Sequence, residues 1–341
     1  MRKLEIPGHW QGGQVILNKA ASWPEGSELR VTGPASKPVI LNVKLPFFAY
    51  GVFKPGQLAF FQIKEFVSHV KRDYFINGSL HLRDGLPFAD QRGQASVRGE
   101  ILEFKSDDAA EMAYQQIFEL EPDKVYEMRL AEASPWPGFD GVPMKVNVMF
   151  GKEPDSGLDT GWQRIVDWED GEWDGSKDPL FTTALELVDE TFADTPRYEF
   201  GEDIKLLFRL EMAYLLLWSA IERYLSLRYD FGESVSFKVK KLSDESAFCQ
   251  ALLKHGPKEN EERRVCRAND PGKAEILDRK KPKKAACYYY QLRSNIVHRG
   301  KGALDDYKHL SKSLEELPKI FRDVLKAAFQ ESQWEGESLR G

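Results

Sequence analysis

The chain has 341 residues, a formal net charge of -6 and 42% hydrophobic residues. This length exceeds the usual size of a single hydrophobic core, so we expect two domains. The longest strongly apolar run, residues 212–221, is too short to cross a bilayer, and residues 1–10 contain no signal-peptide core. We therefore expect a cytoplasmic protein with no membrane partner.

The cysteines and histidines predict reduced thiols and no metal site. Cys249, Cys266 and Cys287 are widely spaced, and their odd number argues against a disulfide framework. No His or Cys pair has metal-ligand spacing. We expect no other cofactor either.

Residues 1–150 are expected to mix strands and helices. Apolar or alternating runs predict strands at 39–43, 46–50, 97–104 and 143–150. Helical spacing occurs at 57–67 and at 107–120, and Ser106 can cap the exposed amides at the start of the second helix. The first domain is therefore predicted to be α+β.

Residues 179–341 are expected to form an all-α domain. The acidic, tryptophan-containing stretch at 151–178 predicts a connection between the two domains. Helical patterns follow at 180–191, 202–229, 244–254, 285–298 and 304–330. Residues 256–282 interrupt these patterns and are so polar that we expect an exposed insertion.

The negative net charge hides one basic segment. Residues 279–304 hold eight Lys or Arg residues and no acid. The side chains that could steer an RNA backbone are Arg279, Lys280, Lys281, Lys283, Lys284 and Arg299. A solvated loop is the alternative. Tyr288, Tyr289 and Tyr290 could stack on bases, although we expect at least one of them in the core.

Arg293 and His298 form a candidate site for cutting RNA without a metal. An imidazole can take a proton from a ribose 2′-hydroxyl near neutral pH, and a guanidinium can hold the phosphate. Asn295 could add a hydrogen bond. Side chains five residues apart diverge by roughly 140° on a straight helix. A shared site therefore requires the helix to end near His298, which Gly300 favours. A surface Arg and a capping His are the alternative.

The residues around this pair resemble the HEPN superfamily, and most closely its Apea-type branch. The resemblance rests on Arg293–Gly300 and on Leu217–Glu222, and it covers residues 202–329. It implies a helical bundle that forms a homodimer and cleaves RNA with Arg293 and His298, Asn295 being the polar residue between them. Glu222 is also a candidate partner for Arg293, with a solvated surface glutamate as the alternative.

A second candidate site follows the strand at 46–50. The glycine-bounded turn after it can direct backbone amides at a carboxylate, because glycine permits a close approach. The expected ligand contacts are Tyr50, Gly51, Val52, Phe53 and Gly56. An ordinary strand-to-helix turn is the alternative.

This turn resembles the Tyr-Gly-x-Leu-x-x-Gly loop of the gamma-glutamylcyclotransferase-like family. The resemblance continues through 97–102, 117–122 and 126–130 and spans residues 40–150. It implies a small α+β barrel-like domain in which Glu121 moves a proton while a substrate amine attacks its own γ-carbonyl. Val52, Phe53 and Phe118 depart from the family pattern and make the pocket more apolar. A role in binding a γ-glutamyl-like or other anionic ligand therefore stays open beside catalysis.

Three functions remain open from the sequence. The first is a metal-independent endoribonuclease of the toxin or antiviral-defence type, with a ligand-sensing N-terminal domain. The second is a γ-glutamyl amine cyclotransferase whose helical half serves only for dimerisation. The third is a non-enzymatic protein that binds RNA or acts as a scaffold.

Overall fold

The computed structural model describes residues 8–11, 14–17, 42–83, 86–91, 95–121, 125–152, 163–164, 173–194, 204–229, 234–259, 261–267, 270–299, 307–336 and 338–340. The chain divides into two units, Met1–Val39 and Ile40–Gly341. Strands β1 (Gly8–Gln11) and β2 (Gln14–Leu17) pair as an antiparallel hairpin in the first unit. Both candidate sites belong to the second unit.

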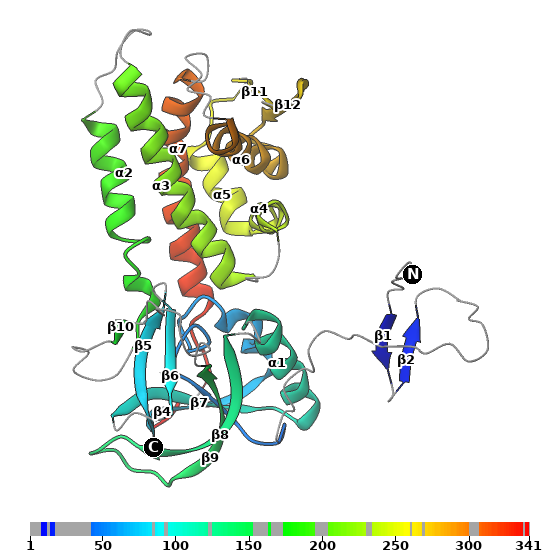
Figure 1. Cartoon of the computed structure of the whole chain (residues 1–341), viewed down its shortest axis with the longest axis vertical. Helices are drawn as coiled ribbons and strands as arrows, with labels where there is room; N and C mark the ends of the chain where they lie inside the picture. The colour runs from blue at the N-terminus through cyan, green and yellow to red at the C-terminus, as the bar shows by residue number, and fades with distance from the viewer. Residues whose placement is uncertain are drawn as a thin grey trace, which may run out of the picture. The chain divides into compact units, whose positions relative to one another are not determined.

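Nine of the described strands of the second unit form one curled sheet (Figure 1). They are β3 (Phe47–Ala49), β4 (Val67–Asn77), β5 (Ser79–Arg83), β6 (Leu86–Asp90), β7 (Ser96–Phe104), β8 (Tyr126–Pro135), β9 (Met144–Gly151), β10 (Gln163–Arg164) and β13 (Ser338–Arg340). Their order is β10-β5-β6-β9-β3-β7-β4-β13. Because β8 pairs with both β4 and β9, the path β4-β7-β3-β9-β8 closes into a small barrel.

The helix α1 (Asp107–Leu120) has the predicted bounds. The hydroxyl of Ser106 accepts a hydrogen bond from the amide of Ala109 at 3.1 Å, which caps the helix as expected. The buried Tyr114 hydroxyl donates to the carbonyl of Leu45 at 2.7 Å, so the helix is fixed to the barrel. The helix ends at Leu120, and this places Glu121 at its C-cap.

The predicted helix at 57–67 is wrong. The segment forms two 3-10 turns, η1 (Phe60–Gln62) and η2 (Lys64–Phe66), and then enters β4. Its apolar side chains do not mark one helix face, because successive residues are enclosed by the protein. Those buried are Leu58, Ala59, Phe60, Ile63 and Val67. Tertiary packing therefore overrides the apparent helical spacing.

The second half of the unit is helical, so the chain as a whole mixes α and β structure as predicted. The helices are α2 (Thr183–Ala193), α3 (Ile204–Arg228), α4 (Val235–Asp244), α5 (Ser246–His255), α6 (Pro282–Arg299) and α7 (Tyr307–Glu331). The sequence analysis missed α4, a short lysine-rich helix. None of the helices in the described ranges is long and apolar enough to cross a membrane.

Residues 256–282 do not form the exposed insertion that their polarity predicted. Strands β11 (Arg263–Arg267) and β12 (Asp270–Leu277) form a hairpin that packs on α6. The guanidinium of Arg263 is buried, and its Nη2 lies 2.5 Å from Glu316 Oε2 of α7. A charged side chain thus orders this segment through a buried ion pair, which composition alone does not predict.

Arg228, at the end of α3, connects the helices to the segment that precedes β4. Its side chain is 4% exposed and forms an ion pair with Glu331 of α7. Its Nε lies 3.5 Å from Glu245 Oε1, between α4 and α5. The guanidinium also lies 3.8 Å from the ring centroid of Phe61. This one buried cation at the end of α3 therefore contacts the end of α7, the junction of α4 and α5, and the segment that precedes β4.

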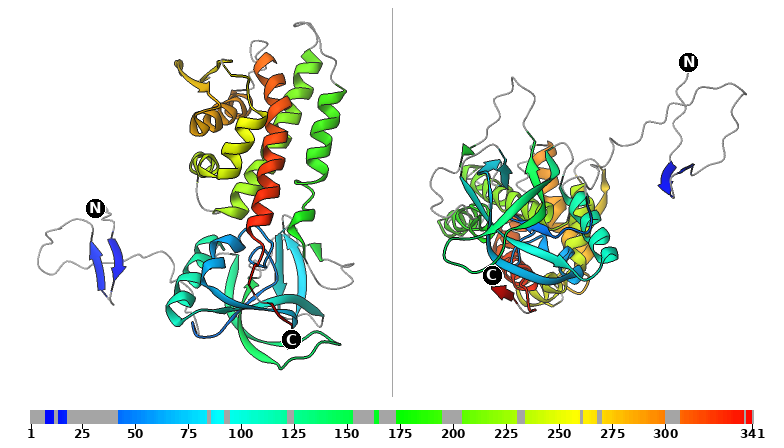
Figure 2. Two further views of the ribbon diagram at one scale, coloured as in Figure 1. Left: turned by 180° about the vertical axis from the view of Figure 1, so that it is seen from behind. Right: turned by 90° about the horizontal axis from the view of Figure 1, so that it is seen from below.

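The end of α7 holds the same segment. The amide of Gly56 donates to the carbonyl of Ser332 at 2.7 Å, and the Trp334 ring packs edge-to-face on Phe60. Gly56 has φ +85°, and a Cβ there would lie 2.9 Å from Gln333 Nε2, so glycine is required. The chain then continues into β13, which pairs with β4 (Figure 2).

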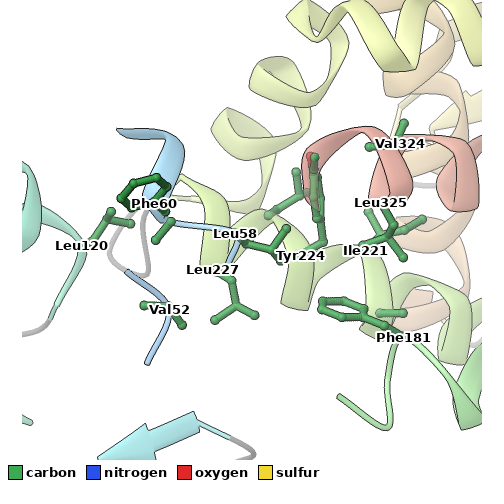
Figure 3. Packing of buried hydrophobic residues seen from close by; sticks show 14 of the residues in the cluster. Val52, Leu58, Phe60, Leu120, Phe181, Ile221, Tyr224, Leu227, Val324 and Leu325 are labelled. Atoms are coloured by element: carbon green, nitrogen blue, oxygen red, sulfur yellow. The ribbon is translucent and has the colours of Figure 1, made fainter. Parts of the chain in front are cut away.

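Apolar side chains complete the junction between the helices and the segment that runs from the turn after β3 to β4. Figure 3 shows Val52, Leu58 and Phe60 gathered in one core with Tyr224, Leu227 and Leu325. Burial of this core contributes to the free energy of folding on the order of 25 cal/mol for each Å² of apolar surface removed from water.

Replacing Arg228 with Met should lower the free energy of unfolding by about 3 kcal/mol, because buried Glu245 loses its charge partner. Urea denaturation followed by tryptophan fluorescence measures the change. Lys44→Ala is the control, because it breaks only the exposed ion pair with Asp107 and should leave the unfolding midpoint unchanged. Equal effects of the two substitutions would contradict the role given to Arg228.

Candidate functional site

A pocket opens at the end of the barrel and is bounded by the turn after β3 and by the C-cap of α1. It contains about 400 Å³ of free space, counting its open mouth. Its lining residues are Phe47, Ala49, Tyr50, Gly51, Val52, Phe53, Leu86, Pro87, Glu121, Tyr126 and Met149. The structure thus brings Tyr50, Gly51, Val52 and Phe53 together with Glu121, as the sequence analysis expected. Gly56 is not among the lining residues, because it contacts the end of α7.

Tyr50 fixes the position of the turn. Its hydroxyl donates to the carbonyl of Met149 at 2.6 Å and accepts a hydrogen bond from the amide of Ala89 at 3.1 Å. Burial raises the pKa of the Tyr50 phenol above its ordinary value, so the group stays protonated. Its hydrogen-bonding capacity is used by β6 and β9, which makes Tyr50 a support of the pocket wall.

The residues of the turn, Gly51, Val52 and Phe53, line the pocket. In the described part of the chain, the amides of Gly51, Val52 and Phe53 donate to no acceptor. A Cβ on Gly51 would lie 3.0 Å from Pro87 Cγ, so a side chain there would narrow the pocket. Successive free amides of this kind provide hydrogen bonds for an anionic or carbonyl oxygen.

Glu121 is the acidic side chain of the pocket lining. Its amide donates to the carbonyl of Ile117 at 2.9 Å, and its extended backbone turns the chain out of α1. Burial raises the pKa of the Glu121 carboxyl to about 8. Its carboxylate has no hydrogen bond or ion pair with any residue that the structure describes.

The wall around these polar groups is mostly apolar. Sequence reasoning missed Phe47 and Ala49 of β3, and it missed four residues that come from other strands: Leu86, Pro87, Tyr126 and Met149. The hydroxyl of Tyr126 donates to the carbonyl of Pro87 at 3.4 Å. Strand periodicity alone cannot distinguish a wall of a pocket from ordinary core. The site therefore combines an apolar wall, free amides and one carboxyl whose pKa lies near that of an amine.

The second candidate site lies on α6. Arg293 Nη2 lies 2.8 Å from Glu222 Oε1 of α3, which confirms the predicted pairing. The described part of α6 extends to Arg299 and keeps both Arg293 and His298 within the helix. The side chains of His298 and Arg299 lie outside the described part, so their distance from Arg293 stays untested.

Asn295 does not lie beside Arg293 as the predicted polar residue of the site. Its side chain is 4% exposed, and its Nδ2 donates to the carbonyl of Cys266 in β11 at 2.9 Å. Its Oδ1 accepts a hydrogen bond from Gln291 at 2.8 Å. Residues two apart project to opposite sides of a helix, and this places Asn295 against the hairpin.

The side chains predicted to steer an RNA backbone do not form one group, and several of them contact separate partners. The guanidinium of Arg279 donates to the carbonyls of Pro257 and Leu253, at the end of α5. Lys280 Nζ lies 2.7 Å from Glu259, and Lys281 Nζ lies 3.1 Å from Asp278. Exposed pairs of this kind exchange readily with solvent. Lys283 and Lys284 are exposed in the first turn of α6.

The three consecutive tyrosines are mainly structural. Tyr288 and Tyr289 are buried, which confirms the expectation that at least one of the three lies in the core and leaves these two unable to stack on bases. The hydroxyl of Tyr288 hydrogen-bonds to His309 Nδ1 at 2.9 Å, and that of Tyr289 donates to Glu316 at 2.9 Å. Tyr290 is half-buried and packs on Trp218.

In the described ranges, no three His, Cys, Asp or Glu side chains are arranged to hold a metal ion. Comparison with protein-family models, curated proteins and solved structures finds no match for the chain.

The raised pKa of Glu121 predicts a pH-dependent stability. Between its ordinary value of 4.5 and about 8, the folded protein holds a proton that the unfolded chain releases, so stability falls as pH rises through this range. Glu121→Gln removes this loss, and we expect its melting temperature to equal that of the wild type at pH 4 and to exceed it at pH 9. Thermal unfolding at both pH values measures this difference. Glu119→Gln, on the exposed side of α1, should show no such divergence.

Proposed function

We propose that the barrel pocket is the active site of a γ-glutamyl amine cyclotransferase. The observation that carries this proposal is Glu121, a carboxyl with a pKa of about 8 that lines one pocket with the free amides of Gly51, Val52 and Phe53. A proton acceptor with a pKa near that of its donor is an efficient general base.

The proposed reaction is an intramolecular attack. The substrate's α-amine loses a proton to Glu121 and forms a bond to its own γ-carbonyl carbon. The free amides of the turn are the donors available to the resulting oxyanion. The bond from the carbonyl carbon to the leaving amine then breaks, Glu121 returns the proton to that amine, and 5-oxoproline is released. The apolar wall excludes water from the reacting groups.

Release of 5-oxoproline from a γ-glutamyl alkylamine, measured by mass spectrometry, tests this function. Glu121→Gln should lower kcat/KM about 100-fold or more, because the proton acceptor is lost. In the wild type, kcat/KM should rise with pH through about 8, since the carboxylate is the active form. Glu119→Gln should match the wild type. A wild-type protein that releases no 5-oxoproline would contradict the proposal.

A second function is supported by a separate observation, the ion pair between Arg293 and Glu222 close to the end of α6. We propose that this end of the helix cleaves RNA without a metal. His298 takes the proton of a ribose 2′-hydroxyl, whose oxygen attacks the adjacent phosphorus, and Arg293 stabilises the charge on the phosphoryl oxygens. The bond from phosphorus to the 5′-oxygen then breaks, the leaving 5′-oxygen takes up a proton from the imidazolium, and a 2′,3′-cyclic phosphate and a 5′-hydroxyl are formed. In the homodimer that the family resemblance implies, two copies share one cleft.

Unstructured RNA incubated with the protein in EDTA tests this second function. We expect products that end in a 2′,3′-cyclic phosphate, and no cleavage of the same RNA carrying 2′-O-methyl groups. His298→Ala and Arg293→Ala should each lower the rate about 100-fold or more. His69→Ala and Arg209→Ala replace exposed residues on other surfaces and should cleave normally. Equal cleavage by all four variants would contradict the proposal.

A further inference from the structure

The mouth of the barrel pocket differs from its interior. Gly51, Leu86 and Glu121 are half-buried, whereas the other residues that line the pocket are buried. These three residues therefore mark the side at which a ligand meets solvent. Leu86 is the first residue of β6 and supplies the apolar side chain of this mouth. The proposed reaction does not use Leu86, which raises the question of what it contacts.

Pro87 continues the wall that begins with Leu86. A Cβ built on Gly51 would lie 3.0 Å from Pro87 Cγ, so the turn after β3 and the start of β6 approach each other closely. The carbonyl of Pro87 accepts a hydrogen bond from the Tyr126 hydroxyl at 3.4 Å, and β6 pairs with both β5 and β9. The apolar wall beside the mouth is thus fixed by its neighbours.

The polar groups of the pocket indicate how a γ-glutamyl amine would be oriented. Its α-carboxylate and its reacting carbonyl both need hydrogen-bond donors, because a desolvated polar group without partners is costly. In the described part of the chain, the amides of the turn donate to no acceptor, and two of them belong to the buried residues Val52 and Phe53. The γ-glutamyl part therefore lies against the turn and Glu121. The substituent on the leaving nitrogen then extends to the mouth.

We propose that Leu86 and Pro87 form the subsite for the substituent of the leaving amine, and that this substituent is an uncharged, apolar group such as a short branched alkyl chain. This inference rests on the proposed cyclotransferase function. An alkyl group placed against Leu86 and Pro87 is removed from water, which favours binding. A carboxylate at the same place would lose hydration and would be repelled by the ionised Glu121. The two residues thus determine which amine leaves.

Three γ-glutamyl conjugates that differ only in the leaving amine test this subsite. They are the conjugates of methylamine, of 3-methylbutylamine and of leucine, which is 3-methylbutylamine with an added carboxylate. The wild-type kcat/KM for release of 5-oxoproline should be about tenfold or more higher for the 3-methylbutylamine conjugate than for either of the others. The methylamine conjugate lacks the apolar contact, and the leucine conjugate adds a charge to it.

Substitutions at the mouth locate the contact. Leu86→Ala should lower kcat/KM for the 3-methylbutylamine conjugate about fivefold and change that for the methylamine conjugate less than about twofold. Gly51→Ala should also reduce the preference for the larger amine, because its methyl group narrows the gap to Pro87. Leu187→Ala removes an exposed leucine of α2 and should leave the preference unchanged. The ratio between two substrates of one protein is unaffected by any loss of folded protein.

The outcomes separate this subsite from the reaction itself. Equal kcat/KM values for the three conjugates, or a preference that persists in Leu86→Ala, would overturn the subsite and leave the cyclotransferase function in place. A wild-type protein that releases no 5-oxoproline from any of the three conjugates would refute the proposed function, and the subsite would be refuted with it.

Discussion

The arrangement of the second unit depends on the contacts made by the buried guanidinium of Arg228. It contacts Glu331 at the end of α7, Glu245 between α4 and α5, and the ring of Phe61 before β4. A buried cation of this kind is stable only while its partners stay in place. The two glutamates therefore fix the helices, and the aromatic ring fixes the segment that leads back to the pocket. The apolar core around them excludes water and strengthens these interactions.

This junction has a direct consequence for the pocket. The turn that supplies Val52 and Phe53 to the pocket continues through Gly56, whose amide is held by the carbonyl of Ser332. One end of the turn is tied by Tyr50 to the barrel, and the other end is tied to α7. Such a turn is held at both ends, and its free amides keep a defined position before any ligand arrives. Preorganised donors of this kind stabilise developing charge without reorganisation.

The sequence predicted those elements whose local pattern agrees with their surroundings. The cap at Ser106 and the apolar stripe of α1 are local signals, and both bounds of this helix are correct. The helix predicted at 57–67 is wrong because this segment is enclosed by the barrel and the helices. Its apolar residues therefore do not follow a single helical period. The hairpin of β11 and β12 was not predicted, because it is held by a buried ion pair as well as by the buried side chains of Val265 and Leu277.

The same distinction applies to the candidate sites. Glu121 and the turn at Tyr50 are far apart in sequence, and only the family resemblance linked them before the fold was known. The pairing of Arg293 with Glu222 was predictable from two helical patterns. The position of Asn295 was not, since it depends on a carbonyl of the unexpected hairpin.

Direct titration of the Glu121 carboxyl tests the central claim, which is that the barrel pocket contains a proton acceptor matched to an amine. Carbon-13 NMR of protein labelled at the glutamate side chains, with Glu121→Gln used to assign the signal, follows this group over the pH range. The account predicts a midpoint near the pKa of about 8 that its burial produces. A midpoint near the ordinary value of 4.5 would show a solvated carboxylate and contradict the account.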